Sequence, residues 1–153
     1  MANERMTRER EVKEFEEVVV SVDRVIRVVK GGRRLRFRAL VLIGDKAGRV
    51  GMGLGKANEV AMAVAKAVVA AKKKLMTVAL KDGTITHEVS AKFGAARVLL
   101  RPARPGTGII AGGATRIIAE LAGVKNLVAK SLGCSNKINN TYATLEALAK
   151  LKK

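Results

Sequence analysis

Residues 24–38 read RVIRVVKGGRRLRFR, and this stretch decides how the first half of the chain folds. β-branched residues precede the pair Gly31–Gly32, alternating basic and apolar residues follow it, and this pattern predicts two strands joined by a tight turn. The stretch contains no acidic residue, and its basic residues are Arg24, Arg27, Lys30, Arg33, Arg34, Arg36 and Arg38. A cationic hairpin attracts a phosphate backbone and releases its counterions, so we predict contacts with nucleic acid; the alternative is a solvated charged surface.

The charge of the whole chain favours contacts with nucleic acid over a solvated charged surface. Its 153 residues hold 30 lysines and arginines against 13 acids, a formal net charge of +17. Six of the acids lie within residues 1–17, so the remainder is more basic still. We therefore expect a polyanionic partner, while an apolar fraction of 48% predicts a packed core.

The residues that build metal and redox sites are almost absent. Cys134 is the single cysteine and His87 the single histidine, which argues against an internal disulfide and a zinc site. The sequence also lacks an apolar run long enough to span a membrane. We expect a cytoplasmic protein with no cofactor, no metal, no membrane partner and no small-molecule substrate.

Three strands and a helix are predicted in the first half. The strands are expected at 15–29, 35–43 and 49–54, followed by a helix capped at Asn58 and ending at Lys74. Its predicted apolar stripe consists of Val60, Val64, Val68, Ala71 and Leu75. Glycines at alternate positions, Gly51, Gly53 and Gly55, indicate that another backbone approaches the third strand closely.

The second half repeats the mixture of strands and helices. Strands are expected at 84–92, 96–101 and 124–132, and helices at 112–121, ending at Gly123, and at 139–150. The fold class is thus α/β in the α+β sense: a three-stranded antiparallel sheet with one helix, then a small C-terminal α/β domain. The predicted division is a mobile acidic arm (1–17), an RNA-binding domain (18–76), a linker (77–83) and the C-terminal domain (84–153).

Two glycine-rich stretches invite a nucleotide-binding interpretation. Gly51–Lys56 ends in Gly-Lys before a helix, but Val50 and Ala57 stand where a phosphate-binding loop needs glycine and a hydroxyl. Gly106–Ala111 fits a looser dinucleotide pattern without the acid that holds a ribose. The remaining acids are scattered, so we predict a protein that is not an enzyme. A nucleotide-dependent enzyme and a free-standing chaperone of duplex RNA remain the alternatives.

Scarce aromatic residues argue against stacking on single-stranded bases, and favour recognition of RNA backbone and shape. At this point two motifs carry a family resemblance. The first comprises Val29–Arg33, Phe37–Val41, Gly44–Asp45, Gly48–Gly51, Gly53, Gly55–Ala57 and Glu59–Val60. The second comprises Pro102–Ala103, Gly106–Gly113, Arg116, Glu120, Ala122–Val124, Lys130, Asn136, Asn139 and Ala143–Thr144. Together they resemble the bacterial small-subunit ribosomal protein S-five family over about residues 18–150.

The resemblance implies a fold, a location and partners. Its N-terminal half would be similar to a double-stranded RNA-binding domain without the first helix. Members contact small-subunit ribosomal RNA, adjoin ribosomal proteins S-four and S-eight, line the messenger entry path, and influence assembly and decoding accuracy. The turn at Lys30–Arg33 would reach toward the head and neck of the subunit, a region linked to spectinomycin sensitivity. Met52, Leu54 and Cys134 depart from residues common in the family.

Charge and resemblance together give two sets of site residues. The predicted RNA-binding set is Arg24, Arg27, Lys30, Gly31, Gly32, Arg33, Arg34, Arg36, Arg38, Arg49, Lys56, Lys72, Lys73 and Lys74. The set expected to face a ribosomal protein, by resemblance the S-four neighbour, is Arg104, Gly106, Thr107, Gly108, Gly112, Gly113 and Arg116. No catalytic or metal-binding residue is predicted.

Overall fold

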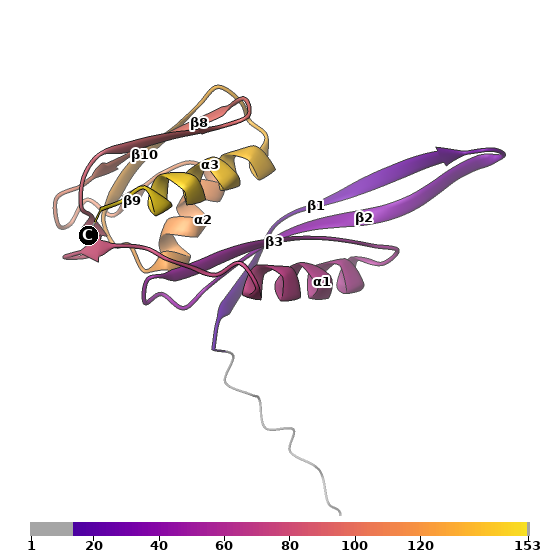
Figure 1. The fold of residues 1–153 in the computed structure, drawn as a ribbon, viewed down its shortest axis with the longest axis horizontal. Coiled ribbons are helices and arrows are strands. Elements are labelled where there is room, and N and C mark those ends of the chain that lie inside the picture. Colours follow the sequence, from indigo (N-terminus) through magenta and orange to yellow (C-terminus); the bar gives the residue numbers. More distant parts are fainter. Residues whose placement is uncertain (1–13, 153) are drawn as a thin grey trace, which may run out of the picture.

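The computed structural model describes residues 14–152, which form two sheet layers with three helices (Figure 1). The N-terminal elements are β1 (Glu16–Val29), β2 (Gly32–Gly44), β3 (Arg49–Ala57), α1 (Val60–Lys72) and β4 (Met76–Thr77). A small hairpin follows, formed by β5 (Leu80–Lys81) and β6 (Thr84–Ile85). The C-terminal elements are β7 (Val89–Phe93), β8 (Ala96–Pro102), β9 (Ile109–Ile110), α2 (Gly113–Ala122), β10 (Leu127–Leu132) and α3 (Lys137–Ala149). The predicted α+β class is confirmed.

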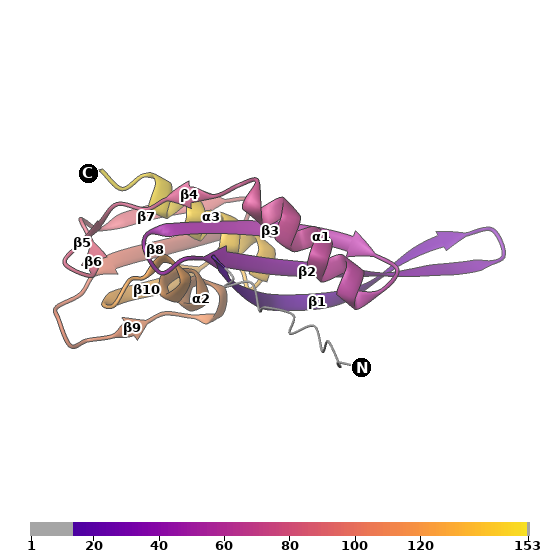
Figure 2. The same ribbon diagram turned by 90° about the horizontal axis from the view of Figure 1, so that it is seen from below.

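The N-terminal sheet has the strand order β1-β2-β3-β4, with antiparallel pairing throughout. β1 and β2 pair from Glu16–Gly44 out to Val29–Gly32, whereas β3 ends at Ala57, opposite Phe37. The hairpin therefore outruns both β3 and α1, and projects from the body as an arm (Figures 1 and 2). We define the arm as residues 24–37. The two-residue strand β4 was not predicted, because so short a segment has no periodicity.

The helix α1 packs directly on the glycines of β3. A Cβ atom added at Gly53 would collide with the carbonyl oxygen of Ala67, and one at Gly51 would lie 2.7 Å from that of Ala71. The predicted close approach of another backbone is confirmed. It also makes Gly51–Lys56 part of a strand packed on a helix, so this stretch is not a phosphate-binding loop.

Several predicted details of α1 are wrong. The helix begins after Glu59 rather than Asn58 and ends at Lys72 rather than Lys74. Its buried residues are Ala63, Ala67, Val68 and Ala71, while Val60 is 41% exposed. The rest of the predicted stripe is confirmed, because Val68 and Ala71 are buried and Val64 and Leu75 pack against the same core. The stripe omitted Ala63 and Ala67, which lie directly over Gly55 and Gly53, where close packing leaves little room for larger side chains.

The N-terminal sheet is buried on both faces. Ala39, Val41 and Ile43 of β2 pack toward α1, whereas Leu40 and Leu42 belong to a second core shared with the C-terminal half. That shared core includes Ile118 and Leu121 of α2. Strand alternation thus places α1 on one face and the C-terminal half on the other.

The turn between β2 and β3 joins the two halves through backbone hydrogen bonds. The N–H groups of Lys46 and Gly48 donate to the carbonyls of Leu121 and Ala122, at 2.9 and 3.0 Å. These carbonyls end α2 and have no partner within their own helix. Gly123 then ends the helix in the left-handed conformation, at φ 83°, as predicted.

The C-terminal sheet has the order β7-β8-β10-β9, in which only the β10–β9 pair is parallel. Helix α3 contacts β7 and β8, and α2 lies between α3 and the N-terminal sheet. The predicted strand at 84–92 is split into β6 and β7, and the predicted linker 77–83 holds β5 and the turn Asp82–Gly83. α3 begins two residues before Asn139, because the Asn136 side chain accepts a hydrogen bond from the Ile138 N–H.

The acidic segment predicted at residues 1–17 is described only in part, because residues 1–13 lie outside the described residues. Residues 14–17 lie in the fold: Phe15 is buried against α1 and Glu16 begins β1. The positions of the domain boundaries stay predictions.

Candidate RNA interface

The arm presents two faces of different chemistry. Residues paired across an antiparallel hairpin share a face, and alternate residues along each strand lie on opposite faces. The pairs Val25–Arg36 and Arg27–Arg34 therefore lie on one face, and Ile26–Leu35 and Val28–Arg33 on the other.

The first of these faces is strongly basic. We call it the cationic face and define it as Arg27, Arg34, Arg36, Arg38 and Lys56. A hollow of about 380 Å³ is lined by Arg27, Arg34, Arg36 and Lys56 together with Val25, Ile26 and Val29. The predicted alternation of basic and apolar residues on β2 is thus present, and it gathers cations from three strands.

The cations of this face differ in their exposure and in whether they pair with an acidic side chain. Arg27, Arg34, Arg36 and Lys56 are exposed. Arg38 is half-buried, and its Nη2 atom donates to Asp23 Oδ2 at 2.8 Å. Arg38 therefore carries a neutralised charge at the base of the arm.

The tip of the arm is open on every side. Lys30, Gly31, Gly32 and Arg33 are all exposed, and a Cβ atom added at either glycine would meet no atom within 4 Å. Gly31 has φ 84°, which favours glycine, so the turn needs this residue for its backbone conformation.

The structure does not bring every predicted RNA-binding residue to the arm. Lys72, Lys73 and Lys74 are exposed at the end of α1, and the Lys74 backbone lies against Gly51. Gly51 and Lys56 lie toward opposite ends of β3, so the three lysines are separated from the cationic face. Arg24 and Arg33 lie on the opposite face of the arm.

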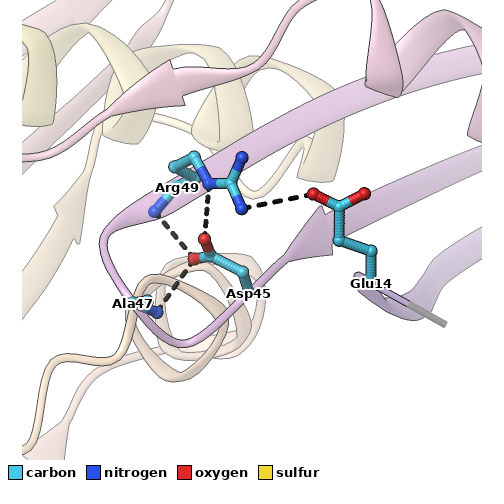
Figure 3. Close-up of polar contacts among 4 residues, drawn as sticks. All are labelled: Glu14, Asp45, Ala47 and Arg49. Atoms are coloured by element: carbon cyan, nitrogen blue, oxygen red, sulfur yellow. Dashed lines mark hydrogen bonds and ion pairs between the residues drawn. The ribbon is translucent and has the colours of Figure 1, made fainter. Parts of the chain in front are cut away.

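Arg49 has contacts within the chain that its sequence context did not indicate (Figure 3). Its Nε donates to Asp45 Oδ2 at 2.6 Å, and its Nη2 reaches Glu14 Oε1 at 3.5 Å. The guanidinium also lies 5.0 Å from the centre of the Phe15 ring. Arg49 thus ties the start of the described chain to the β2–β3 turn.

The Asp45 carboxylate organises this turn. Its Oδ1 atom accepts from the N–H groups of Ala47 and Arg49, at 2.8 and 2.9 Å. Desolvation by itself would raise the pKa of Asp45, but the hydrogen bonds from Arg49 and Ala47 outweigh it and hold the pKa below its ordinary value. The same bond to Asp45 raises the pKa of Arg49 above its ordinary value.

The second predicted surface is the loop between β8 and α2. Arg104, Gly106, Thr107, Gly112, Gly113 and Arg116 are exposed, and Gly108 is half-buried. Added Cβ atoms at the four glycines would meet no atom within 4 Å, so these backbones face open space. The predicted residues therefore lie, mostly exposed, on the segment between β8 and α2 and on the first turn of α2.

Asn126 holds this loop, and sequence reasoning missed it. Its Oδ1 atom accepts from the N–H groups of Gly106 and Gly108, at 3.1 and 3.0 Å. Arg116 contributes from α2, where its Nη2 donates to the Ile109 carbonyl at 3.1 Å. No local signal pointed to Asn126, because its two partners lie 20 and 18 residues away in the sequence.

Other classes of site find no support among the described residues. Within residues 14–152 no cluster of three or more histidine, cysteine, aspartate or glutamate residues could hold a metal ion. No helix in that range is long and apolar enough to cross a membrane.

Comparison with known proteins decides the family. The family model "Ribosomal protein S5, N-terminal domain" matches residues 15–79, and "Ribosomal protein S5, C-terminal domain" matches residues 91–153. The chain belongs to the ribosomal protein S5 family, the S-five family of the sequence analysis. It is 55% identical over 139 residues to "Small ribosomal subunit protein uS5" of Campylobacter jejuni subsp. jejuni serotype O:23/36 (strain 81-176), covering 91% of this chain and 95% of that protein.

The predicted family is therefore confirmed, together with its location in the ribosome. As an S5 protein, the chain is a component of the small ribosomal subunit, where its partners are ribosomal RNA and other ribosomal proteins. S5 is a family of structural ribosomal proteins.

Proposed function

We propose that the cationic face of the arm binds phosphates of small-subunit ribosomal RNA. The observation that carries this proposal is the grouping of Arg27, Arg34, Arg36 and Lys56 around one hollow of the exposed arm. Cations gathered on a projecting hairpin neutralise phosphates and fix orientation without reading bases. Lys30 and the two glycines at the open tip extend the same contact.

Lys72, Lys73 and Lys74 form a separate RNA contact in this proposal. They stand at the C-terminal end of α1, at a distance from the arm along β3. Two cationic sites on one rigid body would bind two RNA segments and restrain their relative movement. Such a restraint supports assembly and the shape of the messenger entry path.

The loop from Arg104 to Arg116 is proposed to dock on ribosomal protein S-four, with S-eight as a further neighbour. Its open glycines allow close approach of another backbone, and Asn126 keeps the loop in shape before docking. Contacts at this surface would affect decoding accuracy.

Salt dependence of RNA binding tests the cationic face. Replacing Arg27, Arg34 and Arg36 with alanine should reduce the slope of log K against log salt concentration by about 2 to 3, because each phosphate contact contributes roughly 0.7 to 0.9. The ligand is protein-free small-subunit ribosomal RNA.

A charge-matched control separates contact from net charge. Replacing Lys92, Arg97 and Lys130, which are exposed in the C-terminal half, removes the same charge away from the arm. The control should leave the slope nearly unchanged. Equal slopes for the two triple variants would contradict the proposed contact.

Charge reversal at Arg116 tests the protein-docking surface. Arg116→Glu should alter miscoding in a reporter more than it alters RNA affinity, whereas Arg116→Gln keeps a donor for the Ile109 carbonyl. Unchanged misreading by Arg116→Glu, or equal effects of the two variants, would count against docking.

A further inference from the structure

The second face of the arm is apolar, although it belongs to the most basic hairpin of the chain. We call it the apolar face and define it as Ile26, Val28 and Leu35 of the arm together with Val19 and Val22, which precede the arm on β1. These side chains are exposed by 48%, 79%, 43%, 45% and 42%. The face continues the side of the sheet that α1 covers, because Val19 and Val22 are paired with Val41 and Ala39. Ile26, Val28 and Leu35 are left open because the arm outruns α1, whereas Val19 and Val22 are exposed on the edge strand β1.

Two arginines flank the centre of this face. Ile26 and Leu35 are cross-strand partners, and Arg24 and Arg33 lie diagonally on either side of them. These four residues line a hollow of about 500 Å³. A ligand in this hollow would meet an apolar floor between two guanidinium groups.

The apolar character continues inward to the helix. A second hollow, of about 540 Å³, is lined by Ala61, Val64, Ala65 and Val68 of α1 and by Glu17 of β1. From Val19 to Val28 the strand is about 30 Å long, the length of a helix of about 20 residues. One helix of that length could therefore cover the whole face.

We propose that the apolar face binds a protein segment, namely an amphipathic helix whose apolar ridge is flanked by carboxylates. Aliphatic side chains along the face fit such a ridge, and Arg24 and Arg33 pair with its flanking acids. RNA fits poorly, because phosphates laid along this face would lose water and meet only two cations. The arm thus lies between RNA on its cationic face and protein on its apolar face.

Adjacent residues of β1 provide the test. A photo-crosslinking amino acid is placed at Val28, on the apolar face, or at Val29, on the opposite face, in the full chain incorporated into small ribosomal subunits. We expect the Val28 adduct to resist ribonuclease, and its crosslinked peptide, identified by mass spectrometry, to be an acidic amphipathic helix. A ribonuclease-sensitive adduct, a peptide of another character, or no adduct at Val28 would overturn the proposal.

A charge variant makes the result specific. With the crosslinker at Leu35, Arg24→Glu combined with Arg33→Glu should lower the yield of protein adduct about fivefold, if each exposed ion pair contributes roughly 0.5 kcal/mol. An unchanged yield would contradict the proposed pairing of Arg24 and Arg33 with carboxylates of the partner helix. Failure at Val28 leaves the RNA proposal intact, because the Val29 adduct reports on the cationic face independently.

A matched pair of valine variants guards against misfolding. Val22→Ser with Val28→Ser alters the apolar face, and Val25→Ser with Val29→Ser makes the same change on the opposite face. Only the first pair should reduce the protein adduct from Leu35. Equal loss in both would indicate damage to the hairpin and contradict a contact specific to the apolar face.

Discussion

Asp45 and Arg49 close the turn between β2 and β3, with the Arg49 Nε atom 2.6 Å from Asp45 Oδ2 and the Arg49 N–H 2.9 Å from Asp45 Oδ1. The same turn supplies the N–H groups of Lys46 and Gly48 to the end of α2. The Asp45–Arg49 pair therefore supports the junction between the two halves, and Arg49 has a structural role beside any contact with RNA.

Loss of the Asp45 charge should destabilise the protein. Asp45→Asn keeps one acceptor oxygen but loses the charged bond to Arg49, and we expect the free energy of unfolding to fall by about 1–2 kcal/mol. Urea unfolding of the isolated chain measures this. Glu88→Gln, which weakens the exposed pair with Arg101, should change it by less than about 0.5 kcal/mol. Similar losses in both variants would contradict the role given to Asp45.

The contribution of Asp45 should depend on pH. Its pKa in the folded protein lies below the ordinary value of 3.8, so the stabilisation is present above that value and declines as pH falls through the folded pKa. The difference in unfolding free energy between the natural chain and Asp45→Asn should stay constant from pH 7 to about 5 and shrink toward pH 3. A difference that shrinks between pH 7 and 6, or persists unchanged at pH 3, would refute this assignment.

A methyl group at Gly53 should disrupt the contact between α1 and β3. Gly53→Ala would push a Cβ atom into the Ala67 carbonyl, and we expect a loss of about 3 kcal/mol or more in unfolding free energy. Gly113→Ala is the control, because its Cβ meets open space at the first helical position of α2. The control should lie within about 0.5 kcal/mol of the natural chain. Equal losses of stability in Gly53→Ala and Gly113→Ala, measured by thermal unfolding, would show that α1 can move away from β3 and would contradict this prediction.

Asn126 should determine the order of the loop between β8 and α2. Asn126→Leu removes the acceptor for Gly106 and Gly108, so hydrogen exchange at these two amides should accelerate about tenfold, as expected for a loss of roughly 1.4 kcal/mol. Asn126→Asp keeps an acceptor oxygen and should retain the protection. Unchanged exchange in Asn126→Leu would mean that the loop is held by other contacts.

Local patterns predicted much of this fold. Alternation over 15–43 and the Gly31–Gly32 pair gave the long hairpin, and the spacing of Gly51, Gly53 and Gly55 indicated the approach of α1. These features depend on residues close in sequence, which is why periodicity reveals them.

Features that depend on contacts between residues far apart in the sequence could not be predicted from local patterns. The stripe expected on α1 omitted Ala63 and Ala67 because their burial depends on the glycines of β3, and the strand β4 depends on pairing with β3. The charge of Arg49 suggested RNA binding, but only the fold brings Glu14 and Phe15 to it. Likewise, the separation of Lys72–Lys74 from the arm follows from the length of β3.

Site-directed cleavage of ribosomal RNA within the assembled small subunit tests whether RNA lies against the cationic face. With Cys134→Ser as background, a tethered iron chelate is attached to Arg34→Cys on the cationic face or to Thr107→Cys on the loop proposed to meet protein. We expect strong, localised RNA cleavage from position 34 and much weaker cleavage from position 107. Cleavage from position 34 that is absent, or no stronger than from position 107, would contradict it.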